Sequence, residues 1–391
     1  MYIVNIGTYP PKQCGIATFS MDLKRSLVQN GNNVSILSVS DETHEYVYPP
    51  EVIFNIRQHH KSDYLKAAQF INSSPLIDLV IIQHEYGIYG GQDGELVMDL
   101  VKLLRRPYVL VTHTVLPQPS KHQKQILNYL CHRAAGIVCM THRSANLLAD
   151  LYEAPREVTS VIAHGVPVFP VHTSMSLKKR FGFEDREVIS TFGLIGPGKG
   201  LELGIKAMQE VCREFPRAHY LILGQTHPML KKLEGEKYRD MLEKMVDDLG
   251  LGQHISFVNR FLSDQELGDY LYLTDIYLSP YPNRDQAVSG TLAFAMGCGR
   301  AIVSTAYSYA LEVLGQGRGL ISDNPDPKEL AALILSISKD PALKQRLQAA
   351  ALSKGKSWTW PNVGKEYTRF FHRVIDNTLL NDEKGVSYAK L

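Results

Sequence analysis

Residues 275–305 read DIYLSPYPNRDQAVSGTLAFAMGCGRAIVST, and this stretch decides the fold. The apolar run 276–281 predicts a strand, and Ser289-Gly290-Thr291 opens an apolar helix that stops at Cys298-Gly299. Residues 301–303 predict a second buried strand. In such a unit the helix N-terminus lies beyond the carboxyl end of the first strand. Its free N–H groups make Ser289, Gly290 and Thr291 a candidate anion site, and a plain helix cap at Ser289 is the alternative.

The rest of the chain repeats this alternation of strands and helices. The other predicted strands are 2–7, 33–39, 52–56, 79–82, 108–111, 136–140, 159–162, 188–193, 219–224, 254–258 and 318–321. The main predicted helices are 16–29, 62–72, 94–105, 120–134, 144–152, 201–214, 234–248, 308–314, 327–338 and 341–352. The proline-punctuated segment 167–173 is the predicted linker. The sequence therefore predicts an α/β protein built from doubly wound parallel sheets.

Length and composition narrow the class of protein. A chain of 391 residues is long enough for two domains, each with its own core. A net charge of only +2 gives no sign of a nucleic-acid partner. Five widely spaced cysteines without a CxxC pair favour a reducing cytoplasm over disulfides or structural zinc. The N-terminus runs directly into a strand and no apolar run approaches ~20 residues, so we expect neither a signal peptide nor a membrane span.

Polar residues follow several predicted strand ends in the first half of the chain. They are Gly15, His84-Glu85, His113 and His164. The carboxyl ends of parallel strands lie along one edge of the sheet, where ligands bind. A single histidine is more often a satisfied imidazole, but several polar groups at one edge favour a site.

A glycine-rich loop follows the first predicted strand of the second half. Residues 193–200 contain four glycines and Lys199, but Gly200 stands where a P-loop requires Ser or Thr. Together with Ser289-Gly290-Thr291, Gly193 and Lys199 predict a diphosphate site made of one cation and one helix terminus. The alternative is a solvated loop lysine.

Several motifs occur in order along nearly the whole chain. They are Tyr9-Pro10-Pro11 with Gly15-Ile16-Ala17, Thr112-His113-Thr114, His164-Gly165-Val166, Gly193 with Lys199-Gly200, AMGCGRAIV over 295–303, and the final helical stretch 358–377. This ordered set resembles the GT-B glycosyltransferases of the retaining family 4, the glycosyl transferases group 1.

The resemblance implies a role for each motif. The Gly15 loop would face donor and acceptor, and His113 would lie beside the transferred sugar. His164 stands in place of the asparagine in the family's NGV motif. Lys199 belongs to a motif similar to GRL…KG, in which Leu194 replaces the usual phosphate-binding arginine.

Two further positions depart from the pattern that the resemblance suggests. The family's Glu-x7-Glu pair corresponds to Gln286 and Phe294. The first glutamate would bind hydroxyls of the sugar, and glutamine keeps an acceptor while adding a donor. The second would bind the nucleotide ribose, which phenylalanine cannot do. The donor base is expected to be read near residues 258–261, where Arg260 lies.

The resemblance implies two Rossmann-like domains facing a cleft: 1–170 for the acceptor, 171–355 for the nucleotide-sugar donor, and 356–391 as a helix crossing back plus a tail. It implies retaining transfer of a hexose to a hydroxyl acceptor, either a glycan, a glycolipid or a small molecule. Lys199, His113 and Gln286 would be catalytic, and His84, Glu85, His164 and Arg260 would be candidate sugar or acceptor contacts.

The remaining expectations concern metal ions, membrane contact and two alternative functions. No DxD-type aspartate pair follows a strand, so we expect no metal and no cofactor. Lys121, Lys124 and Arg133 are too few to predict peripheral membrane contact, and a solvated helix face is the better interpretation. Two alternatives stay open: a GT-B glycoside phosphorylase, and a nucleotide- or glycan-binding pseudoenzyme. Donor base, sugar, acceptor and oligomeric state are left undetermined by the sequence.

Overall fold

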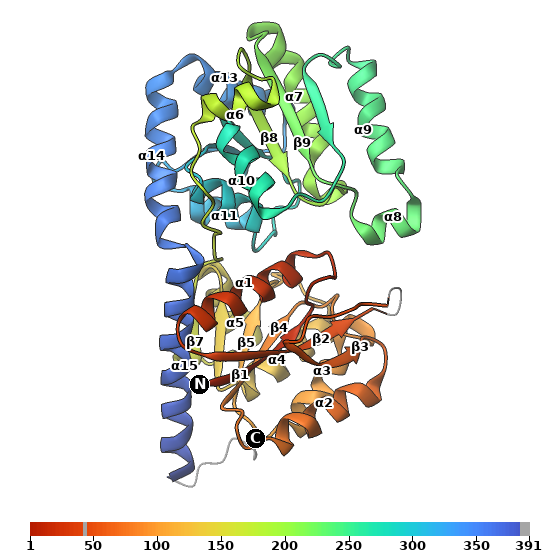
Figure 1. Ribbon diagram of the computed structural model, residues 1–391, viewed down its shortest axis with the longest axis vertical. Helices are drawn as coiled ribbons and strands as arrows, with labels where there is room; N and C mark the ends of the chain where they lie inside the picture. The colour runs from red at the N-terminus through yellow and green to blue at the C-terminus, as the bar shows by residue number, and fades with distance from the viewer. Residues whose placement is uncertain (42–44, 384–391) are drawn as a thin grey trace. The chain divides into compact units, whose positions relative to one another are not determined.

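The computed structural model describes residues 1–41 and 45–383 and divides into two α/β units (Figure 1). Unit 1 comprises Met1–Gly165 and the chain from Trp360 onward, and unit 2 comprises Val166–Thr359. The sequence placed these boundaries after residues 170 and 355, whereas the chain passes between units after Gly165 and after Thr359.

Unit 1 contains a parallel sheet with the order β3-β2-β1-β4-β5-β6-β7. Its strands are β1 (Tyr2–Gly7), β2 (Asn33–Ser40), β3 (Val52–Arg57), β4 (Leu79–His84), β5 (Tyr108–Thr112), β6 (Gly136–Cys139) and β7 (Thr159–Val161). Every residue of β4 and β5 is buried, as expected for central parallel strands with helices on both faces.

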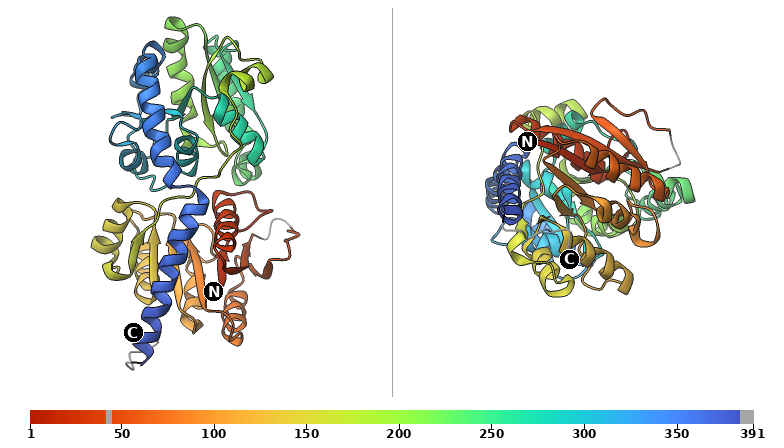
Figure 2. Two further views of the ribbon diagram at one scale, coloured as in Figure 1. Left: turned by 60° about the vertical axis from the view of Figure 1, so that its left-hand side comes forward. Right: turned by 90° about the horizontal axis from the view of Figure 1, so that it is seen from below.

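The helices of unit 1 alternate with these strands. They are α1 (Gly15–Gln29), α2 (Lys61–Ser73), η1 (Gln92–Gly94), α3 (Leu96–Leu103), α4 (Lys121–Arg133), α5 (His142–Tyr152), η2 (Arg156–Val158) and α15 (Trp360–Glu383). The last helix, α15, lies along unit 1 beside α1 (Figure 2). Asn32 Nδ2 donates to Thr368 Oγ1 at 3.0 Å. A Cβ on Gly364 would lie 2.0 Å from Ser26 Oγ, so the absent side chain allows the close contact.

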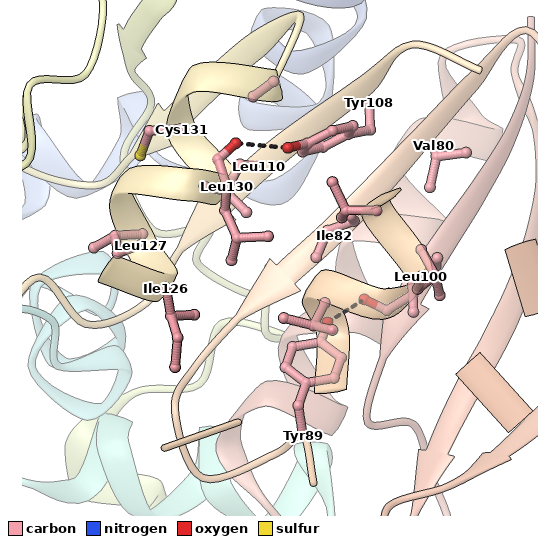
Figure 3. Packing of buried hydrophobic residues seen from close by; sticks show 14 of the residues in the cluster. Val80, Ile82, Tyr89, Leu100, Tyr108, Leu110, Ile126, Leu127, Leu130 and Cys131 are labelled. Atoms are coloured by element: carbon pink, nitrogen blue, oxygen red, sulfur yellow. Dashed lines mark hydrogen bonds between the residues drawn. The ribbon is translucent and has the colours of Figure 1, made fainter. Parts of the chain in front are cut away.

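The core of unit 1 fills the space between the sheet and its helices (Figure 3). Val80 and Ile82 of β4 pack with Leu100 of α3 and with Leu127 of α4. Tyr108 lies in this apolar layer and its hydroxyl donates to the Leu130 carbonyl at 2.6 Å. A buried phenol needs such a partner, so the contact fixes β5 against α4.

Unit 2 contains a second parallel sheet with the order β10-β9-β8-β11-β12-β13. Its strands are β8 (Glu187–Phe192), β9 (Ala218–Leu223), β10 (Ile255–Val258), β11 (Ile276–Ser279), β12 (Ala301–Thr305) and β13 (Leu320–Ser322). With two parallel-sheet units, the predicted α/β class is confirmed.

The helices of unit 2 correct the prediction in two places. They are α6 (Ser174–Phe181), η3 (Pro197–Lys199), α7 (Leu201–Glu214), α8 (Pro228–Glu234), α9 (Lys237–Asp248), α10 (Asp264–Leu273), α11 (Gly290–Gly297), α12 (Ser308–Leu314), α13 (Pro327–Lys339) and α14 (Pro341–Ser357). The helix predicted over 234–248 begins later, at Lys237, as α9; the separate helix α8 precedes it and was not predicted, and Gly235, with a positive φ, lies between the two. Helix α6 directly follows the predicted linker and was not predicted.

Side-chain caps explain where many of these helices begin. Ser120 and Ser263 each form a capping box with the residue three positions on, and Asp340 accepts from two backbone N–H groups at the start of α14. These bonds satisfy donors that have no partner inside the helix, so they fix the residue at which each helix begins.

Each sheet has one point where the strand order reverses. In unit 1 it lies between β1 and β4, and in unit 2 between β8 and β11. Crossover helices leave to opposite faces at this point, so the loops after the two strands diverge and leave room for a ligand. The residues after β1 and β4, and those after β8 and β11, are therefore the first place to look for a site.

Two sequence expectations concern the chain as a whole. All five cysteines are free thiols. No helix within the described ranges is both long enough and apolar enough to cross a bilayer.

Candidate functional site

The loop after β8 is brought against the loop after β11 by two glycines. Gly193 has φ +132°, and a Cβ there would meet both Lys199 and Thr291 within 3.4 Å. Gly200 has φ +62°, and a Cβ there would lie 2.1 Å from the Pro280 carbonyl oxygen. Both positions therefore require glycine, and their close approach places Lys199 beside the residues that follow β11.

Lys199 is held by a tyrosine at this switch point. Its Nζ donates to the Tyr281 hydroxyl at 2.6 Å and lies 4.5 Å from the centre of the Tyr281 ring. The same hydroxyl is 2.9 Å from Thr291 Oγ1, which is 3.1 Å from Ser289 Oγ. The structure thus brings together Gly193, Lys199, Ser289 and Thr291, as the sequence predicted, and adds Tyr281.

The start of α11 offers backbone donors at the same place. Ser289 Oγ accepts from Leu292 N at 3.3 Å, so Ser289 does cap the helix. The backbone N–H groups of Gly290 and Thr291 have no acceptor among the residues that the structure describes. A helix N-terminus with free N–H groups carries a partial positive charge, so it favours an anion.

The Tyr281 phenol is electrostatically coupled to Lys199. Burial opposes ionisation of Tyr281, but the neighbouring ammonium and hydroxyl hydrogen bonds outweigh it and lower the pKa of the phenol. Tyr281 is missing from the predicted site because a tyrosine after an apolar strand reads as core. The one available signal was its position, directly after the strand-ending Pro280.

Gln286 and Phe294 have different surroundings. Gln286 Nε2 donates to the Val288 carbonyl at 2.8 Å, so the side chain braces the loop before α11 and does not cap the helix. Phe294 is buried and stacks on Phe192 with ring centres 6.0 Å apart. Gln286 remains a candidate contact through its oxygen, whereas Phe294 is part of the apolar packing.

The second cluster lies at the carboxyl ends of β4 and β5 in unit 1. His84 is 1% exposed, and its Nδ1 has no hydrogen-bond partner among the described residues. His113 Nε2 is 2.8 Å from Gln83 Oε1, and Gln83 Nε2 donates to Asn5 Oδ1 at 2.9 Å. Glu85 accepts from the Thr114 hydroxyl at 2.5 Å. Gln83 was not predicted, because a polar residue inside an apolar strand gives no sign of its partner.

His164 joins this cluster through aromatic contacts. The Phe19 ring lies 4.8 Å from the His113 ring and 5.2 Å from the His164 ring. Trp360 of α15 packs on the same Phe19 at 5.1 Å, and a Cβ on Gly165 would lie 2.2 Å from the Trp360 ring. Trp360 at the start of α15 therefore packs on the phenylalanine that contacts both His113 and His164.

Burial keeps the three imidazoles uncharged near neutral pH. It lowers the pKa of His84 and of His164 to about 4. It lowers the pKa of His113 to about 3, and the neighbouring His164 and His84 add to this effect. Burial also raises the pKa of Glu85 against the hydrogen bonds from Thr114 and from the backbone. Neutral imidazoles bind hydroxyl groups without attracting charge.

Two predicted residues lie apart from these contacts. Gly15 is the exposed first residue of α1, and a Cβ there would meet no atom within 4 Å. Arg260 is exposed after the edge strand β10 and pairs with Glu266 at 2.7 Å. Within the described ranges, the structure contains no group of three or more His, Cys, Asp or Glu side chains that could hold a metal ion.

Comparison with protein families gives two adjacent matches. The family "Glycosyl transferases group 1" matches residues 175–354, and "Glycosyltransferase Family 4" matches residues 14–168. The first match covers most of unit 2 and the second covers most of unit 1.

Curated relatives share modest identity with the chain. A GDP-mannose-dependent alpha-(1-6)-phosphatidylinositol monomannoside mannosyltransferase from Mycolicibacterium smegmatis is 25% identical over 48% of this chain and 46% of its own length. A D-inositol 3-phosphate glycosyltransferase from Nocardioides sp. is 24% identical over 61% of this chain and 53% of its own length. The matches thus span about half the length of these relatives.

Solved structures resemble the chain over nearly its whole length. Sucrose-phosphate synthase from Thermosynechococcus elongatus has a TM-score of 0.78 at 16% identity, covering 96% of this chain and 100% of its own. Anabaena Alr3699/HepE in complex with UDP has a TM-score of 0.75 at 16% identity, covering 95% of this chain and 100% of its own. At this identity the likeness shows the fold, and the expected GT-B fold is confirmed.

The buried histidines predict a pH dependence of stability. An unfolded histidine has a pKa near 6.5, so between pH 6.5 and 4 the unfolded state binds protons that folded His84 does not. Stability is therefore complete above pH 6.5 and falls as the pH drops toward 4. His84→Phe should flatten this loss by up to ~1.4 kcal/mol per pH unit, measured by urea unfolding.

The exposed His59 provides the control for this measurement. His59→Gln should leave the slope of unfolding free energy against pH as in the wild type. An unchanged slope in His84→Phe would show that His84 is not held neutral by burial.

Proposed function

We propose that this chain, which belongs to the glycosyl transferases group 1 with a Family 4 N-terminal region, transfers a hexose from a nucleotide-diphosphate sugar to a hydroxyl acceptor. Transfer would retain the configuration of the anomeric carbon and would need no metal ion. Unit 2 would bind the donor and unit 1 the acceptor, the latter being a glycan, a glycolipid or a small molecule. The five free thiols accord with a reducing cytoplasm as its location.

The observation that carries this proposal is the isolated charge of Lys199. Its ammonium is half-buried, and the Tyr281 phenol is its one hydrogen-bond partner in the described part of the chain, with no carboxylate in reach. Buried cations are normally paired, because desolvation is costly. The free N–H groups of Gly290 and Thr291 add positive potential on the same side. Such a site suits a bound diphosphate.

The relatives support a nucleotide as the carrier of this diphosphate. The Mycolicibacterium relative is named for dependence on GDP-mannose, and the Anabaena protein is also described in complex with UDP-glucose. These donors differ in base and agree in their diphosphate. The shared chemistry matches the Lys199 site, and the base remains open in our proposal.

In the proposed mechanism, the sugar–phosphate bond breaks and negative charge grows on the departing diphosphate. Lys199 and the N-terminus of α11 stabilise that charge, with the greatest effect where water is excluded. The sugar passes through an oxocarbenium-like state, and the acceptor hydroxyl attacks the face that the diphosphate leaves. The hydroxyl proton passes to a phosphate oxygen. His113, neutral at physiological pH, would hydrogen-bond a sugar hydroxyl.

One observation favours a second candidate, binding without turnover. Phe294 packs between Phe192 and Phe169 in a position where the resembling family has a glutamate, so that acceptor for the ribose is lost. The same phosphate site could also serve a phosphorylase that uses inorganic phosphate.

A ligand panel tests these functions directly. We expect thermal stabilisation by at least one of UDP, GDP and ADP, and sugar transfer from the matching nucleotide-sugar in the presence of excess EDTA. Retention would appear in the product anomer by NMR. A response to inorganic phosphate alone would favour the phosphorylase, binding without transfer would favour the pseudoenzyme, and rescue of EDTA-treated protein by Mg²⁺ would contradict metal independence.

Lys199→Ala should lower kcat/KM by about 10- to 150-fold, since it removes a charge-assisted hydrogen bond worth ~1.5–3 kcal/mol. Lys199 is the last residue of the short helix η3 and is not part of the apolar core, so the melting temperature should stay close to that of the wild type. Lys232→Ala, on the exposed face of α8, is the matched control and should retain full activity. Full activity of Lys199→Ala would contradict a role in binding the diphosphate and would show that Lys199 is a solvated lysine.

Gln286 should act through its oxygen. Gln286→Ala removes both the loop brace and a sugar contact, so kcat/KM should fall by about 5- to 150-fold, or ~1–3 kcal/mol. Gln286→Glu keeps an acceptor for the sugar but loses the bond to the Val288 carbonyl. It should therefore retain more activity than the alanine variant while its melting temperature drops. Unchanged kinetics in both variants would limit Gln286 to bracing the loop.

A further inference from the structure

We propose that Tyr281 is a positioning residue of the diphosphate site, holding the Lys199 ammonium in place and linking it through hydroxyl groups to the start of α11. This inference rests on the proposed function, because it concerns the same anion site. It assigns a role to a residue that sequence patterns placed in the core.

The first step is the number of donors on Lys199. An ammonium has three N–H donors, and Tyr281 accepts one of them at 2.6 Å. The centre of the ring is 4.5 Å from the ammonium, so the charge lies at the hydroxyl edge of the ring. Two donors remain for phosphate oxygens. Tyr281 thus fixes a long, flexible side chain without using up its binding capacity.

The second step is the direction of the hydrogen bonds. Lysine can only donate, so the Tyr281 oxygen accepts from Lys199. The Tyr281 hydroxyl is 2.9 Å from Thr291 Oγ1, which is 3.1 Å from Ser289 Oγ, and in each of these two pairs either hydroxyl can be the donor. The lysine and the helix cap are therefore joined by hydroxyl groups into one connected unit.

The third step is the rigidity of Tyr281 itself. It is 4% exposed and stacks on Tyr307 with ring centres 5.0 Å apart and planes 18° apart. Its carbonyl oxygen accepts from Thr305 Oγ1 at 2.5 Å. A side chain packed and bonded in this way can impose its position on a loop lysine, which a mobile residue could not do.

Tyr281→Phe isolates the hydroxyl, and Tyr108→Phe is its matched control. Both tyrosines are 4% exposed, and both variants keep the ring and lose one buried hydroxyl; that of Tyr108 donates to the Leu130 carbonyl in the core of unit 1. We expect Tyr281→Phe to weaken binding of pyrophosphate, and of the nucleoside diphosphate that the wild type prefers, by ~10-fold in calorimetry. Tyr108→Phe should change both dissociation constants less than about twofold, even if its melting temperature falls equally.

A double-mutant cycle separates positioning from an independent contact. If Tyr281 acts through Lys199, Tyr281→Phe should change binding less than about twofold when introduced into Lys199→Met. Equal or tighter binding by Tyr281→Phe would overturn the inference, and so would a full ~10-fold loss in the Lys199→Met background. Should Tyr281→Phe fail to fold, Thr291→Val cuts the next link in the chain and should weaken pyrophosphate binding similarly.

The outcomes also distinguish this inference from the function beneath it. A wild type that binds neither pyrophosphate nor any nucleoside diphosphate overturns both. A wild type that binds and transfers sugar, with an unaffected Tyr281→Phe variant, overturns the role of Tyr281 alone.

Discussion

The hydrogen bond between Lys199 and Tyr281 joins the two loops that diverge at the switch point of unit 2. A half-buried ammonium without a carboxylate carries a desolvation cost that the fold must offset. Partial compensation comes from the phenol oxygen of Tyr281. Gly193 and Gly200 both hold positive φ values beside this contact; a Cβ on Gly200 would collide with the Pro280 carbonyl oxygen, and one on Gly193 would crowd Lys199 and Thr291. The half-buried Lys199 ammonium thus costs some local stability, and its charge is left available to a ligand.

In unit 1 the polar groups that follow the strands carry no charge, unlike Lys199 in unit 2. Burial lowers the pKa of His84, His113 and His164, so these imidazoles are neutral. The orphan Nδ1 of His84 shows that this region is not optimised for stability, because a buried polar atom without a partner is costly. A site of uncharged imidazoles suits a hydroxyl-bearing ligand, and a site built on a bare cation suits an anion. The two sheets share a topology and differ in charge.

Sequence patterns predicted the sheets well because central parallel strands are continuous apolar runs, as in Leu79–His84. They also paired Lys199 with Ser289, since both follow strands that topology places side by side. They missed Tyr281, because a tyrosine in an apolar run resembles a core residue until its hydrogen bond with Lys199 is known. Helix α6 was missed because its cap, Thr173, merges with the linker, and α8 was missed because it is a short helix of seven residues that follows a predicted loop. The hydrogen bond from Gln286 to the Val288 carbonyl was also not predictable, because it depends on the conformation of the loop.

The replacements at Gln286 and Phe294 change the balance of forces in the site as a whole. Where the resembling family has two carboxylates, this chain has a neutral amide and a phenylalanine packed against Phe192. Among the described residues no carboxylate pairs with Lys199, so under the proposed function its full charge would be directed at the ligand. Affinity would then come chiefly from the diphosphate, and the sugar and ribose would contribute directional hydrogen bonds to neutral groups and backbone. Selectivity between donors must therefore depend on shape and on hydrogen bonds. A lysine held rigidly by Tyr281 favours this arrangement, because a fixed charge orients the diphosphate and the diphosphate in turn orients the sugar.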